Sequence, residues 1–576
     1  MQVDGNESDD ESDWSPDDDD DDEQNQDDTL PYGSSSLSAL HARNRVDKQP
    51  KQLNPPAPSV ILENKKDAFS PSLEYFCLSH PISVVRGLAH VLRLDLSLFS
   101  TKTLVDTDPG HVVEIRSQRQ QASDENWDAH GKRKVWRCDS QSSCTTLLKY
   151  AQYQAHSFQE AVRDEKLSMS TSSSANNNSI SKLLSTKTEP SAPSPSLNAS
   201  PRAKKAFKTI KFGTNVDLSD EVKWKPQLQE LAKLPPFMRV VSAGNMLTHV
   251  GYKIDGVNAL QMYLKVPGCR TPGHQENNAF CSLNINIGPG DCEWFGVDEK
   301  YWTLIEELCE RHNVDFLNGS WWPSLDDLHA ATIPVYRFLQ KPGDLVWVNA
   351  GCVHWVQSTG WCNNVSWNIG PLVYAQYKSA IERYEWNRLR FYKSIVPMIH
   401  LSWNIARNLK ITDRRLYEYV RYVLMQSLKQ CQLSINYVEN CGCELKYQSR
   451  APDEPAHYCY DCDGEVFNVL FVSELSEPKK STSDKSATLA QHVVHCQACA
   501  RKRNHLLDNY VILHQYSMDE LKLIYDQFQL YIPSLLGVLN SLNSEAAAAA
   551  AATGSAAGGA MSSTSAGSAS SQVTFY

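Results

Sequence analysis

Residues 260–287 read LQMYLKVPGCRTPGHQENNAFCSLNINI, and this stretch decides the fold. Apolar and polar residues alternate on both sides of its central TPGHQENN segment, as they do along a β-strand that has one apolar face. The apolar positions are Leu260, Met262, Leu264, Val266, Cys281, Leu283, Ile285 and Ile287, and the polar ones include Gln261, Tyr263, Lys265, Ser282, Asn284 and Asn286. We therefore predict two strands joined through TPGHQENN.

Further period-two segments follow at residues 344–349, after the turn Pro342-Gly343, and at residues 364–369. Several such strands closing on themselves predict a small barrel or sandwich. Polar side chains that point inward are costly unless they serve a ligand, so a polar interior indicates a binding cavity. The alternative is that these polar faces are simply solvated.

The regions around this β-rich block read differently. A helix is predicted over residues 84–98, where Val85, Leu88, Val91 and Leu92 have helical spacing, and short strands are predicted at 112–115 and 134–136. Residues 372–430 also have helical periodicity. The predicted fold class is α+β, with a mainly β catalytic core and helical flanks.

The segment between the first two strands carries a metal-binding pattern. In an extended chain residues i and i+2 project to one face, so His274 and Glu276 can share one ion. His354, in AGCVHWVQS, offers a third ligand. Two His and one carboxylate with three open positions are typical of non-haem Fe(II) oxygenases, whereas zinc prefers a closed tetrahedron. The alternative is an ordinary histidine near a turn.

An Fe(II) centre of this kind needs a second electron source to cleave O2, and 2-oxoglutarate can supply it while chelating the iron. Its distal carboxylate must then be held by a cation and by hydrogen-bond donors. Lys265 can provide the charge, and Thr271 and Asn284 can provide the hydrogen bonds.

A second motif lies near the C-terminus. Two C-x2-C pairs, Cys459 with Cys462 and Cys496 with Cys499, are separated by 33 residues. Four thiolates with this spacing predict a closed structural Zn(II) site. Cys441 and Cys443 are expected to be unpaired thiols, and His457 and His495 to be bystanders.

Charge and composition restrict the class of protein. Of 576 residues, the first 30 hold fifteen acidic residues and no Lys or Arg, so the net charge of −11 becomes +4 for the remainder. The acidic segment predicts a disordered tail. An acidic N-terminus and the lack of an 18-residue apolar run argue against secretion and membrane insertion. The sixteen cysteines are then expected to be intracellular thiols or metal ligands.

Two long segments now carry a resemblance. VSAGNMLTHVGYKIDG…MYLKVPGCRTPGHQENNAFCSLNINIGPGDCEWFGV and NGSWWPSLDDLH…YRFLQKPGDLVWVNAGCVHWVQSTGWCNNVSWNIGPL resemble the JmjC domain of the UTX subgroup of histone lysine demethylases. The resemblance runs from about residue 58 to 530 and includes the C-terminal cysteines. It implies a cupin-like double-stranded β-helix followed by a zinc-binding domain.

The resemblance also implies an activity. The family removes methyl groups from tri- and dimethylated lysine 27 of histone H3 by N-methyl hydroxylation, releases formaldehyde, and so relieves transcriptional repression. By resemblance, His274, Glu276 and His354 hold Fe(II), and Lys265, Thr271 and Asn284 bind 2-oxoglutarate. Tyr263 lines the methyl-lysine pocket, as do Gln261 and Ser282. Ascorbate is the expected reductant.

Partners and location follow from the same resemblance. We expect the H3 tail in nucleosomes as substrate, a nuclear location, and association with a histone methyltransferase complex, without sequence-specific DNA binding. No 34-residue helical repeat is found here, so docking through tetratricopeptide repeats is not expected. Two other functions remain open: a weakly active scaffold that recruits partners, and an oxygenase that stably hydroxylates a protein side chain.

The expected organisation has seven parts. These are an acidic tail (1–56), a mixed helical segment packed on the catalytic core (57–167), a low-complexity linker (168–203), the JmjC catalytic domain (204–400), a helical linker (401–450), a zinc-binding domain (451–530) and an Ala/Ser/Gly tail (531–576).

Overall fold

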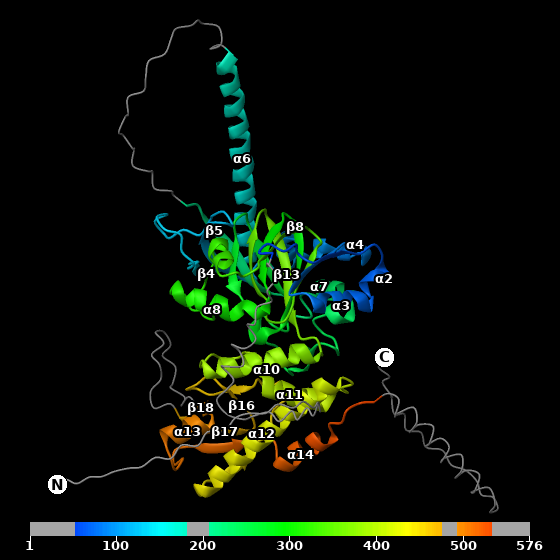
Figure 1. Cartoon of the computed structure of the whole chain (residues 1–576), viewed down its shortest axis with the longest axis vertical. Helices are drawn as coiled ribbons and strands as arrows, with labels where there is room; N and C mark the ends of the chain where they lie inside the picture. Colours follow the sequence, from blue (N-terminus) through cyan, green and yellow to red (C-terminus); the bar gives the residue numbers. More distant parts are fainter. Residues whose placement is uncertain (1–51, 181–206, 475–491, 533–576) are drawn as a thin grey trace, which may run out of the picture. The chain divides into compact units, whose positions relative to one another are not determined.

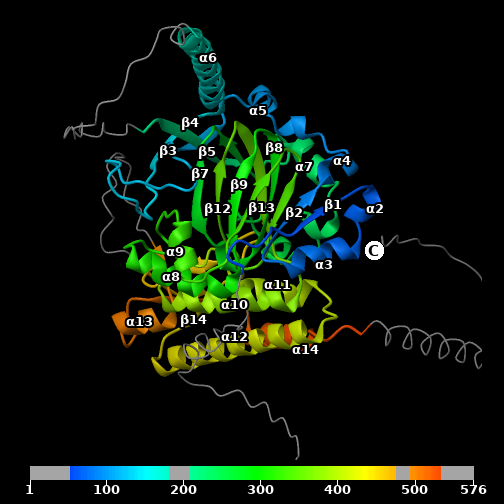
Figure 2. The same ribbon diagram turned by 45° about the horizontal axis from the view of Figure 1, so that its top comes forward.

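Two β-sheets pack on each other to form the catalytic core (Figures 1 and 2). The computed structural model describes residues 52–180, 207–474 and 492–532, and of residues 167–180 only the backbone. The acidic tail up to residue 51, the predicted linker beyond residue 180 and the Ala/Ser/Gly tail beyond residue 532 lie outside the described residues. One shared cluster of buried side chains, including Trp294 and Val356 from one sheet and Val346 and Cys362 from the other, joins the two layers.

The larger sheet has nine strands in the order β1-β2-β11-β8-β13-β6-β5-β3-β4. Their bounds, in that order, are Ser59–Ile61, Ile82–Arg86, Leu345–Val348, Cys281–Pro289, Cys362–Ile369, Gln261–Lys265, Thr209–Asp217, Val112–Arg119 and Gln141–Thr146. Only β1 and β2 pair in parallel. The strands predicted from alternation are confirmed as β6, β8, β11 and β13.

The smaller sheet has the antiparallel order β10-β9-β12-β7. These strands are Tyr336–Gln340, Cys292–Val297, Val353–Ser358 and Arg270–His274. Because β8 and β13 lie in the larger sheet while β7, β9 and β12 lie in the smaller one, the chain passes repeatedly between layers. The fold is the expected double-stranded β-helix with helical flanks.

The helix predicted over residues 84–98 is wrong. The segment forms β2, a short helix α4 (Leu88–Val91) and a 3-10 turn η1 (Leu96–Phe99). Gly87 separates strand from helix with φ +78°, a left-handed conformation, and an added Cβ would lie 2.8 Å from the carbonyl oxygen of Leu62. Val84 and Val85 are fully buried and pair with β11, so sheet pairing overrides the helical spacing.

Two other expectations are corrected. Lys134 makes only an isolated bridge to Trp127, so residues 134–136 are not a strand. The polar faces of β6 and β8 are not solvated, since Lys265, Ser282, Asn284 and Asn286 are each less than 9% exposed. A polar interior is therefore built into the core.

The remaining helices surround the sheets and extend beyond them. Helix α6 begins at Leu147. In its first turn Tyr150 packs into the core, and its hydroxyl donates to the carbonyl oxygen of Leu264 at 2.5 Å. The helices are α2 (Lys65–Ala68), α3 (Pro71–Ser79), α5 (Thr101–Thr107), α6 (Leu147–Ile180), α7 (Lys225–Leu231), α8 (Trp302–Arg311), α9 (Leu325–Ala330), α10 (Tyr374–Leu389), α11 (Met398–Asn408), α12 (Arg414–Asn440), α13 (Gln497–Arg503) and α14 (Met518–Gln527). The 3-10 turns are η2 (Pro236–Met238), η3 (Met246–His249), η4 (Asn277–Ala279) and η5 (Glu299–Tyr301).

The predicted helical region at 372–430 is confirmed as α10, α11 and most of α12. After it come two small sheets, β14-β19-β17-β18 and β15-β16. Their strands are Leu445–Tyr447, Val511–His514, Val469–Glu474 and His492–His495, then His457–Tyr458 and Glu465–Val466. Glu465 of β16 accepts hydrogen bonds from the backbone amides of Ile399 and His400, so it caps the first turn of α11.

Candidate metal centre

Three potential metal ligands meet at one end of the smaller sheet. His274 ends β7 and lies opposite His354 of β12 in the strand register, while Glu276 follows two residues after His274. The Nε2 atoms of His274 and His354 are 3.8 and 3.5 Å from Oε1 of Glu276. All three ligand atoms lie within 4.8 Å of one another. Strand pairing therefore brings together residues that are 80 positions apart in the chain.

Backbone carbonyls orient both imidazoles. Nδ1 of His274 lies 2.9 Å from the carbonyl oxygen of Pro272, and Nδ1 of His354 lies 3.2 Å from that of Cys352. A carbonyl only accepts, so each Nδ1 carries the proton and each Nε2 keeps its lone pair toward Glu276. Burial lowers the pKa of His354 to about 3, which keeps that ring neutral.

The second oxygen of the Glu276 carboxylate accepts a hydrogen bond from the larger sheet. Nδ2 of Asn368, on β13, donates to Oε2 of Glu276 at 2.9 Å. Burial by itself raises the pKa of Glu276, but the two imidazoles and hydrogen bonds from Asn368 and Ser282 outweigh it and leave the pKa below its usual range. Glu276 is thus an ionised ligand whose Oε1 faces the two Nε2 atoms.

Two imidazoles and one carboxylate, all on one side, suit a divalent metal that keeps open positions for other ligands. Outer hydrogen bonds of this kind fix ring orientation and make the ligands more basic. The donor set therefore fits Fe(II).

Lys265 lies buried on the neighbouring strand β6. Its ammonium is 3.8 Å from Sγ of Cys292 and 5.7 Å from the centroid of the Phe212 ring, and within the described part of the chain no carboxylate pairs with it. Cys362, together with Lys265, lowers the pKa of Cys292 to about 6. Cys292 is therefore an acidic partner of this buried cation, and the carboxylate of a ligand could add charge-assisted hydrogen bonds there.

The other predicted co-substrate residues lie on two other strands, one in each sheet. Thr271 is on β7, and Asn284 on β8 accepts hydrogen bonds at Oδ1 from Asn364 at 2.9 Å and from Gln340 at 3.2 Å. Asn364 and Gln340 are fully buried and were not singled out from the sequence. In NNVSWN, Asn364 and Asn368 are four residues apart on one strand face, and that spacing was the available signal.

The predicted substrate residues are placed near the metal ligands. Tyr263 precedes Lys265 on the same face of β6, and its hydroxyl lies 3.3 Å from Oε1 of Gln261. Burial and the charge of Glu276 raise the pKa of Tyr263. Ser282 is buried and hydrogen-bonds to Glu276. Tyr263 therefore stays an uncharged phenol close to the carboxylate.

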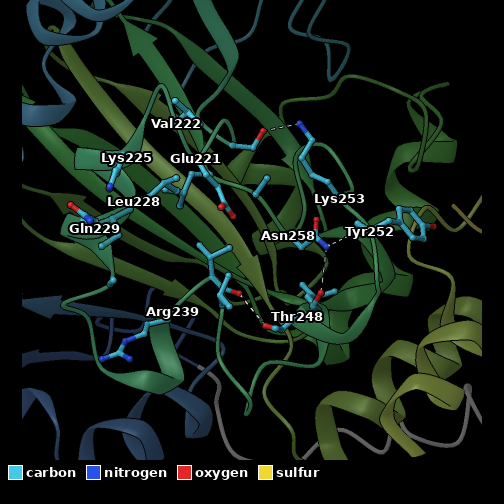
Figure 3. A pocket seen from close by; sticks show the side chains of 18 of the residues that line it. Glu221, Val222, Lys225, Leu228, Gln229, Arg239, Thr248, Tyr252, Lys253 and Asn258 are labelled. Carbon is cyan, nitrogen blue, oxygen red and sulfur yellow. Dashed lines mark hydrogen bonds between the residues drawn. The ribbon is translucent and has the colours of Figure 1, made fainter. Parts of the chain in front are cut away.

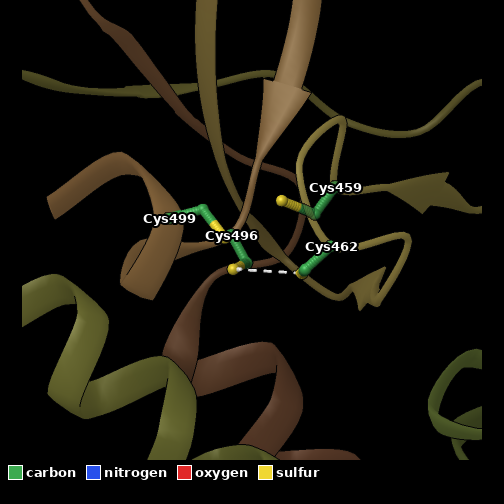
Figure 4. Close-up of side chains that lie close together, drawn as sticks. All are labelled: Cys459, Cys462, Cys496 and Cys499. Atoms are coloured by element: carbon green, nitrogen blue, oxygen red, sulfur yellow. Dashed lines mark hydrogen bonds between the residues drawn. The ribbon is translucent and has the colours of Figure 1, made fainter. Parts of the chain in front are cut away.

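Four thiols form a second cluster. The Sγ atoms of Cys459, Cys462, Cys496 and Cys499 lie within 4.8 Å of one another (Figure 4). All are free, and the Cys462 and Cys496 sulfurs are 3.9 Å apart. Hydrogen bonds from Cys496 lower the pKa of Cys459 to about 4. The donor set fits a tetrahedral zinc ion.

One of the two histidines beside these cysteines is more than a bystander. His495 is fully buried, and its Nδ1 is 3.0 Å from Oδ2 of Asp461, which also accepts from Arg503 at 2.7 Å. This contact ties the loop between Cys459 and Cys462 to helix α13. His457, by contrast, pairs with Glu454 away from the thiols.

Three models of known protein families match parts of this chain. Residues 261–369 match the model of the JmjC hydroxylase domain. Residues 376–431 match the C-terminal helical domain of lysine-specific demethylase 6/UTY, and residues 448–518 match the GATA-like domain of the same family. The chain belongs to the lysine-specific demethylase 6 family. The first match contains the three potential ligands and Lys265, and the third contains the four clustered cysteines.

Two relatives of this demethylase 6 family chain are similar over most of its length. Human lysine-specific demethylase 6B is 54% identical over 503 residues, which cover 87% of this chain and 29% of that protein. Lysine-specific demethylase jmjd-3.1 of Caenorhabditis elegans is 33% identical over 422 residues, which cover 72% of this chain and 38% of that protein. The chain therefore spans well under half the length of these relatives.

A large cavity lies elsewhere on the chain and contains none of the potential metal ligands. It has a volume of about 1010 Å³ and is lined by α7 and the segment around residues 239–260 (Figure 3). Lys253 in its wall is already paired with Asp217 and Asp255. None of the predicted site residues lines it, so size does not mark the site here.

Among the described helices, none combines the length and apolar character needed to cross a membrane.

Proposed function

We propose that this chain is an Fe(II)- and 2-oxoglutarate-dependent demethylase of tri- and dimethylated lysine 27 of histone H3. One observation supports it above all: the Nε2 atoms of two histidines and one carboxylate converge, and a buried lysine without a carboxylate partner among the described residues lies in the other sheet. The names of the relatives support the choice of a methylated lysine as substrate.

In this proposal His274, Glu276 and His354 hold the iron. Lys265 neutralises the distal carboxylate of 2-oxoglutarate, and Thr271 and Asn284 complete its hydrogen bonds. With O2, iron and 2-oxoglutarate supply the hydroxylation of an N-methyl group, which is then released as formaldehyde. Asn284 is pre-oriented for this role because Asn364 and Gln340 already occupy its carbonyl oxygen.

The methyl-lysine would lie against Tyr263, with Gln261 and Ser282 beside it. The face of a tyrosine ring attracts a quaternary ammonium by about 0.5–2 kcal/mol, depending on desolvation. Gln261 orients the Tyr263 hydroxyl, and Ser282 joins this wall to Glu276. These groups position the N-methyl group and exclude water from the ligand cluster.

The four cysteines would hold a structural zinc, which makes residues 451–530 a zinc-binding domain that reads parts of the histone tail. Cys459→Ser should release zinc and weaken binding of an H3 peptide while iron binding persists. Elemental analysis of both metals tests this, and zinc content equal to that of the wild type would contradict it.

The other assignments rest on the family resemblance. They are the nucleosomal H3 tail as partner, a nuclear location, association with a histone methyltransferase complex, and ascorbate as the reductant that sustains turnover. The domain boundaries at residues 57, 168, 204, 401, 451 and 531 are part of the same proposal.

Incubation with Fe(II), ascorbate, 2-oxoglutarate and a trimethylated H3 peptide tests the activity. Mass spectrometry should show stepwise loss of CH2 units, and His274→Ala should abolish that loss. A stable gain of one oxygen would instead indicate a side-chain hydroxylase, and binding without a change in mass would indicate a scaffold.

A further inference from the structure

A small polar hollow adjoins two of the metal ligands. Its volume is about 50 Å³, and His274 and Glu276 form part of its wall. The opposite wall comes from α10, which contributes Arg383 and Asn387. That volume holds roughly two water molecules, or about one peptide group.

This polar hollow contains buried polar atoms without partners. Among the described residues, Nδ2 and Oδ1 of Asn278, Oδ1 of Asn387 and Nη1 of Arg383 make no hydrogen bond. Asn278 is 2% exposed, and Arg383 is 8% exposed. Each such atom has lost its hydration without gaining a hydrogen bond, so four of them in residues that line one hollow beside a candidate active site point to a ligand.

The backbone of Asn278 is also unusual. It adopts φ +51° and ψ +30°, and the next residue, Ala279, also has a positive φ of +53°. Left-handed backbone is disfavoured for residues other than glycine and clusters at ligand-binding sites. Here it follows directly after Glu276 and turns the amide of Asn278 into the hollow.

The guanidinium of Arg383 is fixed in place. It stacks between the rings of Trp302 and Trp386, with centroid distances of 4.2 and 4.8 Å, and its Nη2 donates to Oε1 of Gln275. Nη1 makes no hydrogen bond, so it can donate one to a ligand in the hollow.

The free atoms define what can bind. They comprise two donors, on Asn278 and Arg383, and two acceptors, on Asn278 and Asn387. An anion would use only the donors, and a cation only the acceptors. One peptide group offers both functions, since its C=O can accept from both donors and its N–H can donate to one of the two acceptors.

A second hollow of about 190 Å³ shares Phe316, Leu317 and Tyr392 with the first. We call it the acidic mouth, because it is lined by Glu306, Glu310 and Asp315. Arg390 is its only lining cation and is 3.2 Å from Glu306, so two acids are left in excess.

We propose that the polar hollow binds the main chain of the substrate next to its target lysine, and that the acidic mouth selects a basic side chain nearby in that peptide. The inference rests on the proposed function but assigns a separate subsite. Glu310 is exposed and makes no ion pair among the described residues, so it carries the charge selection.

An arginine scan tests the acidic mouth. Peptides with one trimethyl-lysine in a neutral sequence receive a single arginine at each neighbouring position in turn. The wild-type chain should favour one position by about tenfold in kcat/KM over the arginine-free peptide, which corresponds to about 1.4 kcal/mol. Glu310→Lys should reduce that preference to below twofold.

Glu307→Gln is the matched control, because Glu307 lies exposed on the same helix outside the mouth. A preference that survives Glu310→Lys would overturn the proposal for the mouth. If no peptide is demethylated, the proposed function fails, and fluorescence anisotropy with the same peptides still tests the preference.

Asn278→Gly tests the polar hollow, because glycine accepts the left-handed backbone while the amide is removed. KM should rise at least tenfold for every peptide, independent of its sequence, with kcat and the KM for 2-oxoglutarate within twofold. Asn313→Gly is the control, since Asn313 is an exposed asparagine with φ +54° outside both hollows. An unchanged peptide KM in a folded Asn278→Gly variant would overturn the proposal.

Discussion

A single proton on each imidazole decides which nitrogen can hold a metal. The carbonyls of Pro272 and Cys352 fix that proton on Nδ1, and these residues lie two positions before His274 and His354. The same i−2 contact is thus used at both ligands. Strand geometry sets the tautomer as well as the position.

Asn368 should tune the metal affinity through Glu276. Asn368→Leu removes the donor at 2.9 Å from Oε2 and leaves a buried carboxylate oxygen without it. We expect Fe(II) affinity to fall about 10- to 100-fold, by analogy with other outer-sphere contacts. Anaerobic calorimetry measures this. Ser366→Ala, on the same strand and bonded to the carbonyl of Leu283, should change the affinity less than twofold.

Lys265 should stabilise the complex with 2-oxoglutarate but not the free protein. Lys265→Met removes a buried charge that has no carboxylate partner among the described residues, so the melting temperature without ligand should not fall. In the wild type, 2-oxoglutarate at 100 times its Kd should add about 2.7 kcal/mol, and the variant should lose this gain. Scanning fluorimetry with and without 2-oxoglutarate would refute the assignment if both proteins gained equally.

At the scale of elements, β7 must pass tightly under a tryptophan to deliver His274. A Cβ on Gly273 would lie 2.0 Å from the ring of Trp321, which is fully buried. The glycine is therefore required by packing, one residue before a metal ligand.

Gly273→Ala should destabilise the fold by about 1–3 kcal/mol or more, because the buried ring must move. Urea denaturation gives the free energy of unfolding. Gly110→Ala, where the nearest atom would be 3.6 Å away, should change it by less than about 0.5 kcal/mol. Equal stability of the two variants would show that β7 tolerates a shift.

The strands and both ligand motifs could be predicted because their signals are local. Period-two alternation marks β6 and β8, and Glu276 lies two residues from His274. The helix over 84–98 failed because burial of Val84 and Val85 in the sheet depends on β11, about 260 residues away. Asn278 and Arg383 could not be predicted, since their meaning comes from contacts made only after folding. The residue roles remain proposals that these experiments test.

At the scale of the whole molecule, a buried pair joins the helical region to the strands beside the cysteine cluster. His400 of α11 pairs with Glu465 of β16, and both side chains are at most 6% exposed. Arg450 reaches Nε2 of the same histidine at 3.3 Å, and its charge opposes protonation. Two separately matched family domains therefore share one polar contact.

This contact predicts a dependence of stability on pH. Burial outweighs the opposing effect of Glu465 and holds the pKa of His400 below its usual value. Because the pKa is lower in the folded chain, the unfolded chain takes up the proton first as the pH falls. The contribution of neutral His400 to the free energy of unfolding is therefore present above about pH 6.5 and is lost as the pH falls below it. The loss is at most about 1.4 kcal/mol per pH unit.

His400→Gln should flatten the pH profile of unfolding free energy between about pH 7 and 5 relative to the wild type. The exposed His130 supplies the control variant, His130→Gln, whose profile should follow that of the wild type. Parallel profiles for His400→Gln and the wild type would contradict the buried-pair account.

The central claim is that His274, Glu276 and His354 hold one iron ion with room for a keto acid. Anaerobic titration of Fe(II) into the chain with 2-oxoglutarate measures it directly, through the charge-transfer absorption of an iron-bound keto acid. We predict saturation at one iron per chain and loss of the absorption in His354→Ala, with the zinc content unchanged. Full absorption in that variant would contradict the claim.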